Sequence, residues 1–137
     1  MDFVTDRTES DALLGNERGV YSYTDLNRVE AAVRDLAAEL SDIGYKISLV
    51  TKTDWGLPGD FSAKDWPVES QMDRYLRNVR YIRNFFPASI RLPTSMEGLT
   101  WEGANNIEKV LKNAAERIAG IKQTWRYSGE VFAGEEL

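Results

Sequence analysis

The chain has 137 residues, of which 42 % are hydrophobic and 28 % are charged, a composition typical of one globular domain with a real core. Cysteine and histidine are absent, which excludes disulfides, thiol chemistry, Ser-His-Asp triads and ordinary zinc sites, so we expect no cofactor and no metal and a chain that folds in a reducing cytoplasm. The net charge of −5 disfavours nucleic acid as a partner, and no segment reaches the ~20 apolar residues that a membrane span needs.

Residues 1–20 are mostly polar and are predicted to form an N-terminal arm, followed by a single helical domain over residues 21–137. A short helix, Glu9 to Leu14, is expected in the arm because Gly15 follows it as a stop signal. The apolar side chains of the arm can dock on the domain or on a neighbouring molecule, and the sequence does not choose between these partners. They are Phe3, Val4, Leu13 and Leu14.

The strongest periodic pattern begins at Thr24 and continues to Ile43. Apolar residues recur there at steps of three and four, which is typical of an amphipathic helix with one buried face. Thr24 is expected to be the N-cap, and Gly44 is expected to end the helix. The apolar stripe comprises Leu26, Val29, Val33, Leu36, Leu40 and Ile43.

After Gly44 the pattern changes to alternation, with Tyr45, Ile47 and Leu49 as its apolar members. This period of two predicts a half-buried strand near residues 45–51. Such a strand needs a partner, which the C-terminal tail, the arm or another subunit can supply. Residues 51–67 then predict a structured loop, because they combine turn residues with two tryptophans.

A second helix is predicted from Val68 or Glu69 to Phe86, where Pro87 stops it. A third helix of about 24 residues is predicted from Trp101, with Thr100 as its N-cap.

The tail, residues 126–137, is a candidate partner strand near the C-terminus. The predicted fold class is therefore mainly α, a bundle of three long helices with a small β addition.

Four arginines follow one another at steps of three along the second predicted helix: Arg74, Arg77, Arg80 and Arg83, with Arg91 beyond. A nucleic-acid binder would place such a row on phosphates. The acidic balance of the chain favours a solvated face with ion pairs instead, and contact with an acidic protein partner is the third interpretation.

Tryptophan faces can stack on sugar rings, which makes Trp55 and Trp66 candidates for ligand stacking. Core packing at helix ends is the simpler interpretation. Asp54, Asp60 and Asp65 share a loop, but their spacing departs from that of a calcium-binding EF-hand and favours turn duty. No pair among the 22 acids is marked out for glycosidase chemistry.

Three segments carry a family resemblance: Tyr23–Glu30 (YTDLNRVE), Thr51–Trp55 (TKTDW) and Ser95–Glu108 (SMEGLTWEGANNIE). Together with the closing WRYSGE at residues 125–130, they resemble a group of small proteins encoded among the tail genes of phages and prophages of Gram-positive bacteria. The resemblance covers residues 21–134. Related tail-fibre proteins commonly have the Lys-Thr-Asp-Trp segment before the Asp-Leu-Asn-Arg-Val-Glu segment, whereas here it follows.

This resemblance implies a virion structural protein of the tail (baseplate, tail tip or fibre region), made in the bacterial cytoplasm, that is not an enzyme. It implies a homo-oligomer that docks on other phage tail proteins, and it carries over no catalytic residue. On the first two turns of the helix, Asn27, Arg28 and Glu30 are expected to be exposed and are the candidate assembly contact. The alternative is local capping and an Arg-acid pair within one subunit.

Two rival functions remain open from the sequence. One is a carbohydrate-binding module for the host cell surface, which would use exposed tryptophans. The other is a small hydrolase that acts on wall polymer through two carboxylates.

Overall fold

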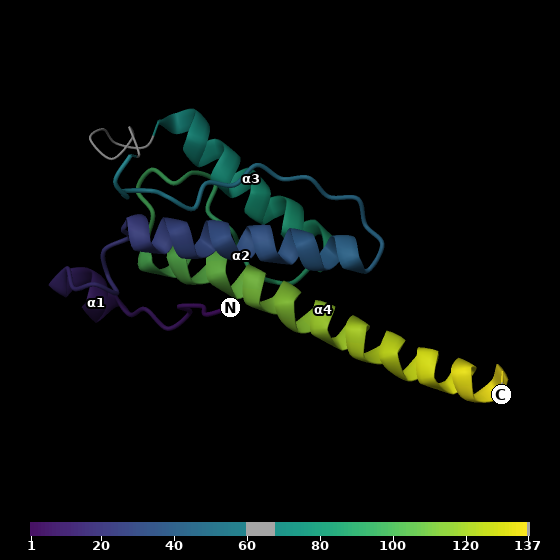
Figure 1. The fold of residues 1–137 in the computed structure, drawn as a ribbon. Coiled ribbons are helices and arrows are strands. Elements are labelled where there is room, and N and C mark those ends of the chain that lie inside the picture. Colours follow the sequence, from purple (N-terminus) through teal and green to yellow (C-terminus); the bar gives the residue numbers. More distant parts are fainter. Residues whose placement is uncertain (60–67, 137) are drawn as a thin grey trace.

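A computed structural model describes residues 1–59 and 68–136. Its helices are α1 (Glu9–Leu14), α2 (Tyr23–Asp42), α3 (Glu69–Phe85) and α4 (Trp101–Glu136). The three long helices pack against one another in pairs, and α1 lies outside them near the start of α2 (Figure 1). The prediction of a mainly helical fold is confirmed.

The core forms from the predicted apolar stripes. Each long helix contributes side chains with no exposed surface, namely Leu36, Leu40, Val79, Ile82, Ile107, Leu111, Ala114 and Ile118. Burying an aliphatic side chain of this size is worth about 1.5–3 kcal/mol, so the bundle is held mainly by these residues.

The start of α2 differs from the prediction, because its N-cap is Ser22 and not Thr24. Asp25 explains the difference. Its carboxylate accepts a hydrogen bond from the backbone N–H of Ser22 at 2.8 Å, which is one half of a capping box. At the other end, Gly44 adopts a φ of 107° and reverses the chain, as expected for a glycine after a helix.

The predicted strand near residues 45–51 is wrong, since residues 45–54 have no regular secondary structure. Of the three apolar residues in the alternation, Ile47 and Leu49 pack against the core, whereas Tyr45 is 48 % exposed. Side chains, and not the backbone of a neighbouring strand, supply the hydrogen bonds here: Arg74 and Asn78 both donate to the carbonyl of Val50 at 2.8 Å. The segment is therefore an extended strap across α3.

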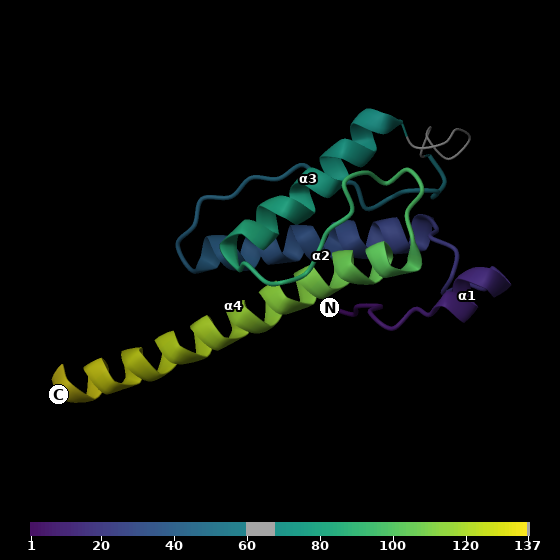
Figure 2. The ribbon, with the colours of Figure 1, turned by 180° about the vertical axis from the view of Figure 1, so that it is seen from behind.

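The predicted strand near the C-terminus is also wrong, because α4 continues as one helix of 36 residues to Glu136. No proline follows Pro93, so nothing in the sequence blocks the helical hydrogen bonds. The predicted cap is confirmed: Gly103 donates its N–H to the hydroxyl of Thr100 at 3.0 Å. The last turns of α4 extend beyond the bundle in two opposite views (Figures 1 and 2).

The N-terminal arm docks on its own chain. Phe3 packs against the core, and Arg7 is only 4 % exposed. The short helix α1 has the predicted bounds and ends at Gly15 with a φ of 63°. Leu13 and Leu14 are 80 % and 75 % exposed, so the docking uses the residues before α1 and not these two leucines. Among the helices described, none has the length and apolar content to cross a membrane.

Candidate functional site

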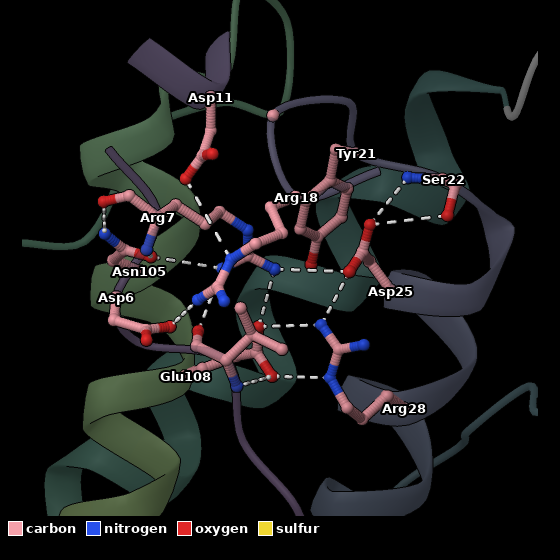
Figure 3. Close-up of polar contacts among 12 residues, drawn as sticks. Asp6, Arg7, Asp11, Arg18, Tyr21, Ser22, Asp25, Arg28, Asn105 and Glu108 are labelled. Carbon is pink, nitrogen blue, oxygen red and sulfur yellow. Dashed lines mark hydrogen bonds and ion pairs between the residues drawn. The ribbon is translucent and has the colours of Figure 1, made fainter. Parts of the chain in front are cut away.

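A group of charged side chains lies where the N-terminal arm meets α2 and α4 (Figure 3). Two arginines and two carboxylates form it, with one amide beside them: Arg7, Arg28, Asp25, Glu108 and Asn105. We call this group the clamp. Its charges balance, which is the condition under which buried ions are tolerated.

Glu108 of α4 is the centre of the clamp and has no exposed surface. Arg28 binds it through two nitrogens, Nε at 2.7 Å and Nη2 at 2.9 Å, in a bidentate arrangement. Arg7 adds a third bond at 2.8 Å, and the backbone N–H of Val4 adds a fourth at 3.0 Å. A carboxylate has about four lone-pair sites, so Glu108 is saturated.

Arg7 ties the arm to the bundle. Its Nη2 lies 2.8 Å from Glu108 and 3.2 Å from Asp25, and its Nη1 donates to Asn105 at 3.3 Å. The side chain of Asn105 also pairs with the backbone of Arg7, accepting from its N–H and donating to its carbonyl, both at 3.0 Å. The side-chain amide of Asn105 thus makes the two hydrogen bonds to the arm that the backbone of a neighbouring strand would make.

Asp25 connects both arginines, since its carboxylate lies 2.6 Å from Arg28 and 3.2 Å from Arg7. The hydrogen bond to Glu108 is the main cause that raises the pKa of Arg28 beyond its usual value, while burial opposes it. The guanidinium of Arg7 also lies 5.6 Å from the ring centre of Tyr21, a cation–π contact.

Below the clamp, the hydroxyls of Tyr21 and Tyr75 hydrogen-bond to each other. Burial is the main cause that raises the pKa of both phenols above the ordinary value of 10.0. Both tyrosines therefore stay neutral in the folded chain well into the alkaline range.

A second buried group links the strap, α2 and α3. Glu30 is 1 % exposed and accepts from the indole Nε1 of Trp55 at 2.5 Å. Its two oxygens also accept from the two terminal nitrogens of Arg74, at 2.6 and 2.9 Å. The amide of Asn27 accepts from the backbone N–H of Trp55 at 2.8 Å and donates to its carbonyl at 2.9 Å. We call these four residues the strap anchor.

The candidate assembly contact was expected to be exposed, and that expectation is wrong. Asn27 and Arg28 are half-buried and Glu30 is buried, because this flank of α2 faces α4 and the strap. All three bind partners in their own chain. The Arg-acid pair of the alternative interpretation is present as Arg28 with Glu108, but Asn27 and Glu30 bind distant residues and are not local caps. An assembly role for them stays a prediction.

Of the two tryptophans that were candidates for stacking on a sugar, the structure describes only Trp55. Trp55 is 1 % exposed, so its face is not available to a glycan, and the core-packing interpretation is confirmed for it. Trp66, Asp60 and Asp65 lie outside the described residues. Within the described residues, no group of three or more potential metal ligands occurs.

Of the clamp, sequence reasoning singled out only Arg28 and missed Arg7, Asp25, Asn105 and Glu108. A signal for the α4 residues was present: Asn105 and Glu108 stand one turn apart among the apolar residues Ala104, Ile107 and Leu111. Polar residues on a buried stripe indicate a buried polar contact. Arg7 carries no such signal, because it stands in a polar segment without periodicity.

Neither group leaves a reactive atom free. In the part of the chain that the structure describes, every buried side-chain nitrogen and oxygen atom has a hydrogen-bond partner. The clamp and the strap anchor therefore hold distant segments together. No protein-family model, curated protein or solved structure matches this chain.

Proposed function

We propose that this chain is a non-enzymatic structural protein of a phage or prophage tail, in the baseplate, tail tip or fibre region of the virion. It acts by self-association and by docking on other tail proteins. One observation carries the proposal: of the three segments that carry the family resemblance, the first binds both of the others in the fold.

The contacts between these segments are specific and distant in sequence. Arg28 of the first segment binds Glu108 of the third, 80 positions away. Asn27 and Glu30 of the first segment bind Trp55 of the second. Residues that must meet to complete a fold are the ones that related structural proteins would share, so these contacts support the resemblance as one of fold.

The burial of these residues favours a structural role over a catalytic one. A general acid or base must reach the proton that it transfers. Glu30 and Glu108 are at most 1 % exposed, and both are held by arginines. These two acids of the resembling segments are therefore committed to holding the fold.

The shape of α4 also supports assembly. Its last turns extend beyond α2 and α3 (Figure 2). Helical turns without tertiary packing are marginally stable in water, so a helix of this kind gains most when it packs on a neighbour.

The proposal is tested by fractionating a lysate in which the virus or prophage is induced. We expect the protein to sediment with tail-containing particles at a fixed ratio to the other tail proteins, and the purified chain to form discrete oligomers. A chain that stays monomeric at high concentration and never enters particles would contradict the proposal.

A further inference from the structure

One face of α3 carries arginines without a carboxylate partner. Among the described residues, no ion pair involves Arg77, Arg80 or Arg83, or Arg91 in the connector that follows. Arg80 donates only to the carbonyl of Thr94, at 3.2 Å. We call these four arginines the arginine face.

Of the other arginines whose side chains the structure describes, only Arg117 likewise has no ion pair. The four arginines of residues 1–43 and Arg74 each lie within 4.0 Å of a carboxylate. The chain has 22 acids against 17 basic residues, so carboxylates are not scarce. Four neighbouring arginines that pair with none of the described carboxylates therefore form a surface that an acidic partner would complement.

The arginine face is compact. A step of three residues turns a helix by about 300°, so Arg77, Arg80 and Arg83 span an arc of about 120° and an axial length of about 9 Å. Arg77 is exposed and the other two are half-buried. The connector that carries Arg91 lies alongside, since Arg80 reaches Thr94.

A row of carboxylates with the opposite charge lies on the same chain. Asp35, Glu39 and Asp42 follow one another on α2 at steps of four and three, which places them within an arc of about 60° and over about 10.5 Å. We call them the acidic stripe. The side chains of Asp35 and Asp42 are 48 % and 71 % exposed, and their pairs with Arg34 and Lys122 are surface pairs of little strength.

We propose that the arginine face of one copy of this chain docks on the acidic stripe of a second copy. The two rows have opposite charge and nearly equal length, and they lie on different helices with no ion pair between them in the described chain. A contact between two different patches is heterologous and generates rings or filaments. The inference rests on the proposed self-association and names its surface.

A nucleic acid is a weaker fit for the arginine face. The chain as a whole has a charge of −5, so phosphates would meet a repulsive field outside this face. A second copy has the same net charge of −5, but it presents its carboxylates as one row that matches the arginine face in length.

The experiment reverses each row separately in the full chain and measures association by sedimentation velocity. One variant carries Arg77→Glu with Arg83→Glu, and the other carries Asp35→Arg with Asp42→Arg. Each alone brings like charges together, so its association constant should fall about tenfold or more. The equimolar mixture should associate again, because each reversed row then meets an opposite one.

The control variant, Lys112→Glu with Arg117→Glu, makes the same change in net charge as the reversal of the arginine face, but at exposed positions of α4 outside both rows, and should associate like the wild type. Raising the salt concentration should weaken the wild-type contact, since screening shortens from ~8 Å at physiological ionic strength to ~3 Å at 1 M.

Three results would overturn the inference: association unaffected by reversal of either row, no recovery in the mixture, or a monomeric wild type. If the association constant is unchanged by both reversals, the proposed function stands, and the chain self-associates through another surface. Absence from particles would count against the proposed function alone.

Discussion

Glu108 accepts four hydrogen bonds and has no exposed surface, yet it stands in a helix whose neighbouring positions are apolar. Two arginines, from the arm and from α2, depend on it for their counter-charge. Its value to the fold comes from the cost of leaving those ions unpaired, more than from the strength of the pairs themselves.

Glu108→Gln should therefore lower the free energy of unfolding by about 3–5 kcal/mol, because the neutral amide leaves buried positive charge uncompensated. Urea titration followed by circular dichroism measures this. Glu116→Gln, at an exposed position two turns further along α4, is the matched control and should stay within about 0.5 kcal/mol of the wild type. A loss at Glu108 no larger than at Glu116 would contradict the role given to the clamp.

The hydrogen-bonded pair Tyr21 and Tyr75 predicts how the stability of the fold depends on pH in the alkaline range. Because burial raises the pKa of Tyr21 and Tyr75 above 10.0, the unfolded chain ionises first. Stability is then complete below pH 10.0 and is lost as the pH rises above it, by up to about 1.4 kcal/mol per pH unit for each group.

Urea titrations at increasing pH test this dependence. The double variant Tyr21→Phe, Tyr75→Phe should lose stability less steeply above pH 10.0 than the wild type, while Tyr81→Phe, at a 41 % exposed position, should keep the wild-type slope. An equal loss of stability per pH unit in all three proteins would contradict the claim that Tyr21 and Tyr75 cause this loss.

At the level of residues, the sequence predicted burial far better than polar partners. The stripe of α2 is predictable because burial follows the helical period. The roles of Arg28 and Glu30 were missed because periodicity does not distinguish a polar residue that faces solvent from one at the edge of the stripe. Their partners, Glu108 and Arg74, are 80 and 44 positions away, and no local pattern links them.

The helices could be predicted because their signals are local. α1 has the predicted bounds, and α3 ends at Phe85, one residue before the predicted end, since stop signals such as Gly15 and Pro87 act on neighbouring residues. The strand near residues 45–51 could not be judged in the same way, because a strand exists only if a partner pairs with it. The segment is bound by side chains of α3 instead, and one of its three candidate partners, the C-terminal tail, is part of α4.

The strap anchor predicts a difference between two arginines of the same helix. Arg74→Ala removes the charge that neutralises Glu30 and one donor to the strap, so the free energy of unfolding should fall by about 3–5 kcal/mol. Arg77→Ala removes an exposed side chain without an ion pair among the described residues and should cost less than about 0.5 kcal/mol.

Hydrogen exchange adds a second measurement. Loss of the anchor should speed exchange at the backbone N–H of Trp55 more than in the centre of α2, because the strap opens before the bundle. Equal effects of Arg74→Ala and Arg77→Ala on stability and exchange would mean that the anchor does not hold the strap.

For the whole molecule, the end of α4 is predicted to matter for assembly and not for folding. The fully buried residues described in α4 end at Ile118, and the last turns lie beyond the bundle (Figure 1). A chain that ends after Thr124 should thus unfold within about 0.5 kcal/mol of the full chain.

A chain that ends after Arg117 is the contrasting variant. It loses Ile118, which has no exposed surface, and should be destabilised by at least about 2–5 kcal/mol. Equal losses from the two truncations would show that the last turns of α4 belong to the folding unit.

The central claim is that this chain is a structural part of a phage or prophage tail, and its most direct test is the position of the protein on intact particles. Immunogold electron microscopy of purified particles locates it. We predict gold label at the end of the tail, absent from particles that lack the gene. Label on the capsid, or particles without label although the protein is abundant in the lysate, would contradict the claim.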